Sequence, residues 1–140
     1  MKAFSATISI SARPETVWAI LTDVRGYPGW NSTVESLDGE IVPGGRLNLR
    51  VKAAPGRPFR LVVSRFEPPL RMVWEGGMPL GLFVGARRFE VAPVGAGSRF
   101  TMAETYRGAL APLVTRALPD LQPSFDAFAA DLKRKAETAA

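Results

Sequence analysis

Short segments of alternating apolar and polar side chains, separated by turn residues, make up most of the chain before residue 107. In the first of them Phe and Ile alternate with Ser and Thr, which predicts a strand with one buried face. Gly and Pro stand between the later segments, as expected for turns in an antiparallel sheet. Gly95-Ala96-Gly97 is a hairpin signal. The predicted strands are residues 4–11, 34–41, 46–52, 59–67, 71–75, 85–93 and 98–106.

Two parts of the chain have helical periodicity instead. Pro14 suits the first position of a helix, and an apolar stripe runs from Val17 to Val24. Residues 27–31 break that helix and predict a second short turn or helix. The remainder, residues 108–140, is predicted to be helical, with prolines that kink or split its first part.

The order of these elements is one strand, two short helices, about six strands and a long helix. It favours a single α+β domain over residues 1–140, in which a curved antiparallel sheet of about seven strands surrounds the C-terminal helix. A long helix rarely fills such a sheet completely. The gap between sheet and helix is therefore the expected ligand site.

Composition narrows the chemistry. The chain has no Cys and no His, which excludes disulfides, zinc-thiolate sites, cysteine nucleophiles and a Ser-His-Asp triad. No acidic residues have metal-ligand spacing, and no glycine loop suits a phosphate, so we expect no metal and no cofactor. The net charge of +5 comes mostly from scattered Arg residues, which favours a solvated surface over nucleic-acid binding. No segment resembles a membrane span or a signal peptide, so we expect a complete, cytoplasmic protein.

The last predicted hairpin carries the candidate polar site. A turn centred on Gly95-Ala96 pairs Phe89 with Met102 and Arg87 with Glu104, on one side of the sheet. The apolar members mark that side as the inner one. The pair Arg87 and Glu104 then either lies near the rim as a structural ion pair or lies deeper as an anchor for a ligand carboxylate, carbonyl or hydroxyl. Tyr106 shares the same face. Glu104 could serve as a base with Tyr106 as donor, or simply stay ionised beside Arg87.

Several apolar side chains are expected to contact a ligand. Trp30 lies near the expected mouth, and Trp74 shares a strand face with Met72; each either stacks on a flat ligand or belongs to the core. Residues 76–85, rich in Gly, Met, Leu and Phe, predict either a flexible gate or a strand with bulges. The expected ligand contacts are Trp30, Trp74, Met78, Arg87, Phe89, Phe100, Met102, Glu104, Phe125 and Phe128, with Val91 in the same wall. The candidate catalytic residues are Arg87, Glu104 and Tyr106.

Three parts of the sequence resemble the SRPBCC (START-like) superfamily, in its polyketide cyclase/dehydrase and lipid-transport branch. The first is similar to the opening of the family and reads Ile8-x-Ile10-x-Ala12-x-Pro14-x-x-Val17-Trp18-x-x-Leu21-x-Asp23-x-x-x-Tyr27-Pro28-x-Trp30-Asn31. The second is similar to the central hairpin of the family and comprises Phe66-Glu67-Pro68-Pro69 and Met72-Val73-Trp74. The third is similar to the last hairpin of the family and comprises Arg88-Phe89-Glu90, Gly97-Ser98-Arg99-Phe100 and Glu104-Thr105-Tyr106-Arg107-Gly108.

The resemblance implies the helix-grip fold with a cavity for a hydrophobic small molecule, and it leaves the function open. Our leading hypothesis is a non-catalytic binding or carrier domain for a lipid, polyketide or other aromatic compound. The second is a cyclase or dehydratase, although the absence of His and Cys disfavours it. The third is a chaperone-activator-like interaction module, whose acidic partner would contact basic residues on the outer sheet face (Arg46, Arg50, Lys52 and Arg60). A homodimer is compatible with each hypothesis.

Overall fold

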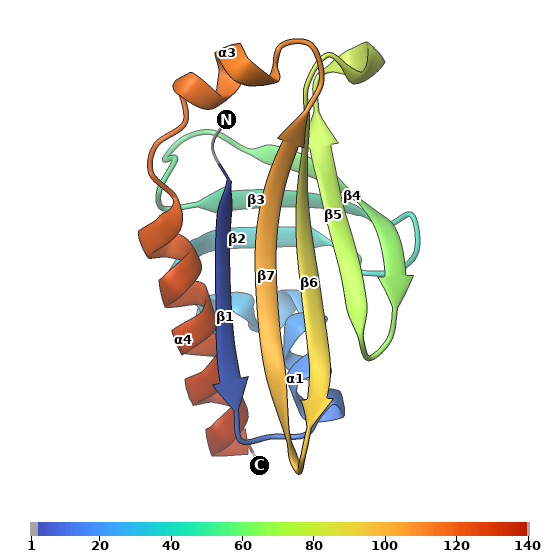
Figure 1. The fold of residues 1–140 in the computed structure, drawn as a ribbon, viewed down its shortest axis with the longest axis vertical. Coiled ribbons are helices and arrows are strands. Elements are labelled where there is room, and N and C mark those ends of the chain that lie inside the picture. The colour runs from blue at the N-terminus through green and yellow to red at the C-terminus, as the bar shows by residue number, and fades with distance from the viewer. Residues whose placement is uncertain (1–2, 140) are drawn as a thin grey trace.

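The computed structural model describes residues 3–139, which form one antiparallel sheet curved around a long C-terminal helix (Figure 1). The sheet has seven strands in the order β1-β7-β6-β5-β4-β3-β2. The strands are β1 (Phe4–Ile10), β2 (Val34–Gly39), β3 (Arg46–Val51), β4 (Phe59–Glu67), β5 (Arg71–Gly77), β6 (Val84–Val94) and β7 (Gly97–Arg107). The helices are α1 (Pro14–Leu21), α2 (Tyr27–Trp30), α3 (Ala111–Arg116) and α4 (Gln122–Ala139), with single 3-10 turns η1 (Val24–Gly26) and η2 (Pro79–Gly81).

Strong curvature lets one sheet enclose a core. In Figure 1, β2 and β3 run crosswise behind β1, β6 and β7, and α4 lies beside β1. Register irregularities between Val63 and Arg65 in β4, and between Val34 and Ser36 in β2, accompany this bending. The predicted α+β helix-grip architecture, with seven strands and two short helices after the first strand, is confirmed.

The predicted register of the last hairpin is also confirmed. Arg87 pairs with Glu104, and Phe89 pairs with Met102. The C-terminal region splits as its prolines predicted, because α3 ends at Arg116 and α4 begins only at Gln122, after Pro119. Residues 76–85 do not form one continuous strand, since β5 runs to Gly77, η2 forms a turn, and β6 starts at Val84. That this segment is a flexible gate stays a prediction.

The core lies between the concave face of the sheet and α4. Phe128 of α4 is its centre: the ring stacks on Phe100 at 6.1 Å and 11° and lies edge-on to Trp30 at 5.6 Å. Trp74 and Phe89 contact each other at 4.6 Å on the sheet side. These aromatic side chains are buried and pack together between the sheet and α4.

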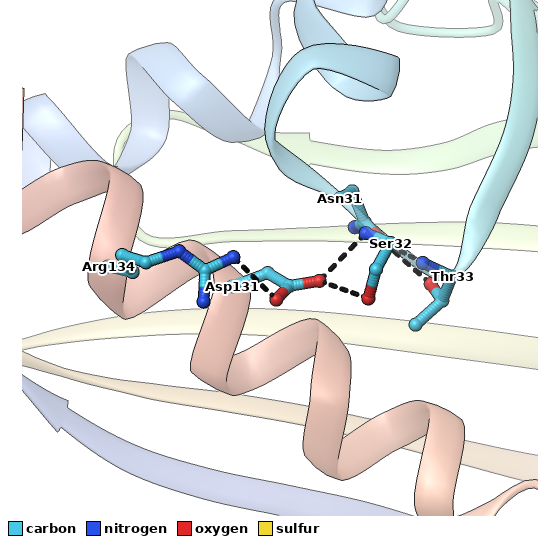
Figure 2. A network of polar contacts seen from close by, with 5 residues as sticks. All are labelled: Asn31, Ser32, Thr33, Asp131 and Arg134. Carbon is cyan, nitrogen blue, oxygen red and sulfur yellow. Dashed lines mark hydrogen bonds and ion pairs between the residues drawn. The ribbon is translucent and has the colours of Figure 1, made fainter.

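A polar network holds α4 against the segment between α2 and β2 (Figure 2). The carboxylate of Asp131, which is buried, accepts hydrogen bonds from the backbone N–H and the hydroxyl of Ser32, each at 2.7 Å, and from Arg134 at 2.9 Å. Although burial alone would raise the pKa of Asp131, the bonds from Ser32 and Arg134 lower it below its usual value. The network therefore fixes the position of α4 over the sheet with a charge that stays ionised.

Candidate functional site

A cavity of about 610 Å³ opens between the sheet and the start of α4, at the end of the molecule that carries α3 and η2. Its wall comes from β3 to β7, from the turn after β3, and from α3 and α4. The lining residues are Thr33, Leu49, Val51, Ala53, Ala54, Arg57, Pro58, Phe59, Arg60, Leu61, Trp74, Gly76, Gly77, Met78, Phe83, Gly85, Arg87, Met102, Glu104, Tyr106, Val114, Leu118, Pro119, Leu121, Ser124, Phe125 and Phe128. Most of this surface is apolar.

Glycines in two neighbouring strands account for the empty space. Directly paired residues of adjacent strands point to the same side of the sheet. One inward row is filled by Trp74, Arg87 and Glu104, which pair across β5, β6 and β7. The next row towards the open end is Gly76, Gly85 and Tyr106. Two of its three positions have no side chain, and the wall recedes at Gly85, where a Cβ would meet only ordinary contacts.

The filled row holds the polar part of the cavity. The Arg87 Nε donates to Glu104 Oε1 at 3.0 Å, and the Tyr106 hydroxyl donates to Glu104 Oε2 at 2.5 Å. The side chains of Arg87 and Glu104 are only 14% and 16% exposed. This decides between the two positions that the sequence left open, because an ion pair at a solvated rim would be far more accessible.

The guanidinium of Arg87 is only partly used by the protein. Its Cζ lies 4.8 Å from the centre of the Phe125 ring, a cation–π contact that covers one face. Within residues 3–139, its one hydrogen-bond partner is Glu104, through Nε. The two terminal amino groups, four N–H donors, have no acceptor among those residues. Arg87 can therefore donate to an acceptor on a molecule in the cavity.

Tyr106 is held as a neutral donor. Its ring stacks on Phe83 at 5.8 Å and 17°, and passes over Gly85, where a Cβ would lie 3.5 Å from the ring. Burial, followed by the charge of Glu104 and the hydrogen bond to it, raises the pKa of Tyr106 well above its usual value. The hydroxyl thus keeps its proton and donates a hydrogen bond to Glu104, so both carboxylate oxygens of Glu104 accept a hydrogen bond.

Most of the residues expected at the site lie in the cavity wall. These are Trp74, Met78, Arg87, Met102, Glu104, Tyr106, Phe125 and Phe128. Trp30, Phe89, Val91 and Phe100 do not belong to the wall. They are packed into the core below the cavity, where Phe128 covers Trp30, Phe89 and Phe100. The inner face was therefore predicted correctly, but its filled and open parts were not distinguished.

Sequence reasoning missed the residues that border the opening. The turn after β3 contributes Ala53, Ala54, Arg57 and Pro58, and α3 with its following linker contributes Val114 and Leu118. Pro55-Gly56 indicated a turn, but no local signal shows which distant element a turn approaches. Three-dimensional closure of the sheet brings this turn to the start of α4.

Two further features bear on the chemistry. In the part of the chain that the structure describes, no three or more Asp or Glu residues are grouped so as to hold a metal ion. No helix between residues 3 and 139 is long and apolar enough to cross a membrane.

A curved sheet that grips one long helix and leaves an apolar cavity between them defines a helix-grip domain, a ligand-binding fold. The sequence agrees with this class: residues 1–137 match the family described as polyketide cyclase / dehydrase and lipid transport. The chain belongs to this family. No protein of curated function matches the chain.

Solved structures of similar fold have diverse descriptions. A Mesorhizobium loti protein, MLL2253, is 18% identical with a TM-score of 0.77, and the match covers 99% of each chain. The Aha1 dimer from Colwellia psychrerythraea is 19% identical with a TM-score of 0.73, covering 98% of this chain and 97% of that one. Truncated norcoclaurine synthase from Thalictrum flavum is 14% identical with a TM-score of 0.68, covering 96% and 92%. At these identities the likeness is one of fold.

Proposed function

We propose that this protein binds or carries an apolar small molecule that bears one hydrogen-bond acceptor. A lipid, a polyketide or another aromatic compound would place its apolar body in the cavity and its acceptor against Arg87. The observation that carries the proposal is an apolar cavity of about 610 Å³ whose deep end presents unused guanidinium donors. The family, whose description includes polyketide and lipid chemistry, supports it.

Size and polarity both favour a small organic ligand. Pockets for such ligands usually have about 300–1,000 Å³ and are mostly apolar, with a few placed polar groups. Here the apolar wall includes Leu49, Trp74 and Met102, and the polar groups are Arg87, Glu104 and Tyr106. A ligand carboxylate, carbonyl or hydroxyl would accept from Arg87 while Glu104 remains its internal counter-charge.

The arrangement of Glu104 favours binding over catalysis. A general base needs a lone pair directed at the substrate proton and within hydrogen-bond reach of it. Both oxygens of Glu104 are already bonded, to Arg87 and to Tyr106. A cyclase or dehydratase is the second candidate, favoured by the placement of a carboxylate and a phenol side by side in the cavity. The interaction-module hypothesis, a homodimer and a cytoplasmic location stay predictions from the sequence.

A ligand screen tests the proposal. Naphthoate and naphthalene share one ring system, but only naphthoate has an acceptor for Arg87. We expect naphthoate and a long-chain fatty acid such as oleate to raise the melting temperature and to appear as bound species in native mass spectrometry. Naphthalene should raise the melting temperature less and give a weaker signal for the bound species. Binding of none of these compounds, and no co-purified organic molecule, would contradict the proposal.

The anchor is tested by removing its charge pair as a unit. Arg87→Met alone would leave Glu104 buried without its cation, so the variant Arg87→Met/Glu104→Gln is preferable. We expect it to bind naphthoate about tenfold or more weakly, because charge-assisted hydrogen bonds contribute about 1.5–3 kcal/mol. Naphthalene binding should change little and serves as the control. Equal losses for both compounds would mean that the substitution damages the cavity rather than an anchor.

The catalytic alternative has its own test. The double variant Glu104→Gln/Tyr106→Phe removes the carboxylate charge and the phenol without changing side-chain size much. A cyclase or dehydratase that used them would lose turnover of a polyketide-like substrate by orders of magnitude, whereas binding of naphthalene would be kept. Turnover unaffected by this variant would exclude these residues as the catalytic pair.

A further inference from the structure

Half of the exposed large apolar side chains that the structure describes lie on two segments that also line the cavity. Among the residues whose exposure the structure describes, eight large apolar side chains are exposed: Val42, Val62, Leu70, Met78, Leu80, Leu82, Val94 and Leu113. Four of them, Met78, Leu80, Leu82 and Leu113, lie on or beside η2 and on α3. The other four are dispersed over different turns and strands.

The segments that carry these four side chains, Met78–Leu82 and α3, lie next to each other. The Leu110 N–H, just before α3, donates to the carbonyl of Leu82 at 2.9 Å. Both segments stand at the same end of the molecule, at the top of Figure 1. Met78 and Val114 from these segments also line the cavity. The four side chains, which we call the apolar rim, therefore stand beside the opening.

Leu80 is the most informative member of the apolar rim. It is 96% exposed, and its backbone is left-handed, with φ of 62°. Left-handed backbone suits Gly and Asn and is unfavourable for Leu. An exposed leucine in that conformation contributes nothing to the core and carries a backbone cost. Folding therefore gives no reason for leucine at this position.

The exposed charges on the segments that border the cavity at this end are mainly positive. Lys52 and Arg57 lie in the turn after β3, and Arg116 lies in the last turn of α3; all three are exposed and have no ion-pair partner within residues 3–139. Arg107 at the end of β7 is paired with Glu75 at 3.5 Å. Asp120, which follows α3, is an exposed anion in the same region, so the cations named here outnumber the anions.

We infer that the apolar rim docks on an anionic lipid bilayer, with Leu80 and Leu113 entering the interface and Arg57 and Arg116 lying against lipid phosphates. Exposed leucines beside basic side chains have the chemistry of a peripheral membrane contact. Docking in this orientation would turn the cavity opening towards the lipid phase, so an apolar ligand could enter or leave without crossing water. This second part rests on the proposed function.

Vesicle flotation tests the docking. Wild-type protein should float with vesicles of equal parts phosphatidylglycerol and phosphatidylcholine, and bind much less to pure phosphatidylcholine. The variant Leu80→Asn/Leu113→Ser should bind the anionic vesicles at least about tenfold more weakly. Asn suits the left-handed backbone at residue 80, so this variant should fold normally. Each of Arg57→Ser and Arg116→Ser should cost about fivefold, and added salt should have the same effect.

Leu70→Ser is the control, since Leu70 is another exposed leucine, 41% against 96% for Leu80 and 64% for Leu113, and lies in the turn between β4 and β5, at the other end of the sheet. It should float like wild type. Docking is overturned if wild type stays with the soluble fraction, in which case the apolar rim would fit a protein partner instead. It is also overturned if Leu80→Asn/Leu113→Ser floats as well as wild type, or if Leu70→Ser loses as much.

Docking and ligand binding can fail separately. Gly85→Leu, which places a side chain in the cavity beside Tyr106, should weaken naphthoate binding but keep flotation. Leu80→Asn/Leu113→Ser should lose flotation but keep naphthoate binding in the absence of vesicles. Flotation without any ligand binding would support docking and contradict the proposed function, and the reverse pattern would contradict docking alone.

Discussion

Gly85 is a position at which the cavity can be narrowed without disturbing the fold. It lies in β6 between Gly76 and Tyr106. A Cβ built on Gly85 would lie 3.5 Å from the Tyr106 ring and 3.8 Å from the Gly76 carbonyl oxygen, which are ordinary contacts. Its backbone is not left-handed, so a side chain is compatible with its conformation. A larger residue would extend into the cavity.

The expected gain can be worked out from these contacts. Replacing a strand glycine by alanine contributes about 0.5–1 kcal/mol, mainly because the unfolded chain loses freedom. Leucine adds further apolar carbons, and burying about half of that side chain contributes about 1–2 kcal/mol more. We therefore expect both Gly85→Ala and Gly85→Leu to raise the free energy of unfolding. At about 4 °C per kcal/mol, the melting temperature should rise by about 2–4 °C for alanine and more for leucine.

Gly76, the direct neighbour of Gly85, gives a control of opposite sign. Its Cβ would lie 2.6 Å from the carbonyl oxygen of Arg60 and 2.7 Å from Leu61 Cδ2, and a backbone oxygen cannot move aside cheaply. Gly76→Ala should therefore destabilise the protein by about 1–3 kcal/mol, the usual range for overpacking. The two variants make the same substitution, glycine to alanine, at directly paired positions of neighbouring strands.

Urea unfolding followed by tryptophan fluorescence measures both effects, and titration with naphthoate measures the cavity. The reasoning is refuted if Gly85→Ala and Gly76→Ala shift stability in the same direction, because the space beside Gly85 would then be absent. It is also refuted if Gly85→Leu is stable and binds naphthoate as wild type does, because the ligand would then occupy another site.

Three other predictions concern groups that hold the fold. Asp131→Ala should lower the free energy of unfolding by about 2–3 kcal/mol, because the hydrogen bonds from Ser32 and Arg134 are lost. Since the pKa of Asp131 is lowered in the folded state, the stabilisation by this carboxylate should be present above about pH 4 and be lost on further acidification. Urea unfolding measured at several pH values would show this loss. Tyr27→Phe should cost about 1–2 kcal/mol in the same assay, because the buried Tyr27 hydroxyl donates to the Leu21 carbonyl at 2.6 Å. Burial raises the pKa of both tyrosines of the chain, Tyr27 and Tyr106, so neither should ionise near pH 10 while the protein is folded. The free energy of unfolding should therefore fall above about pH 10, where the tyrosines of the unfolded chain lose their protons. An ultraviolet titration in which the tyrosines of the native protein ionise near pH 10 would contradict this.

The pairing of Arg87 with Glu104 was predictable because register in a hairpin follows from its turn. Gly95-Ala96 fixes the two central residues, and every pair further along the hairpin is then set by counting. Alternation assigned the inner face by the same logic. Local rules thus gave the correct pairing as far as Arg87 and Glu104, and they placed this polar pair on the concave side of the sheet.

The depth of each side chain could not be predicted in the same way. Phe89 and Phe100 share the inner face with Arg87 and Glu104, but only the first two lie beneath Phe128 of α4. Where the helix crosses the sheet depends on contacts between residues far apart in the sequence. The Asp131 network, which joins α4 to Ser32, is one such contact, and no local pattern indicates it.

The two glycines of the open row have different physical reasons to be glycine. At Gly76 the Arg60 carbonyl excludes any side chain, so its glycine is explained by the fold. At Gly85 no such contact exists, and alanine would fit and stabilise the strand. A residue that forgoes available stability next to a buried ion pair is typical of a functional site, where space is kept at the expense of folding free energy. Gly85 therefore distinguishes the role of the sheet in folding from its role in ligand binding. A substitution there should make the protein more stable and weaken its binding of a ligand.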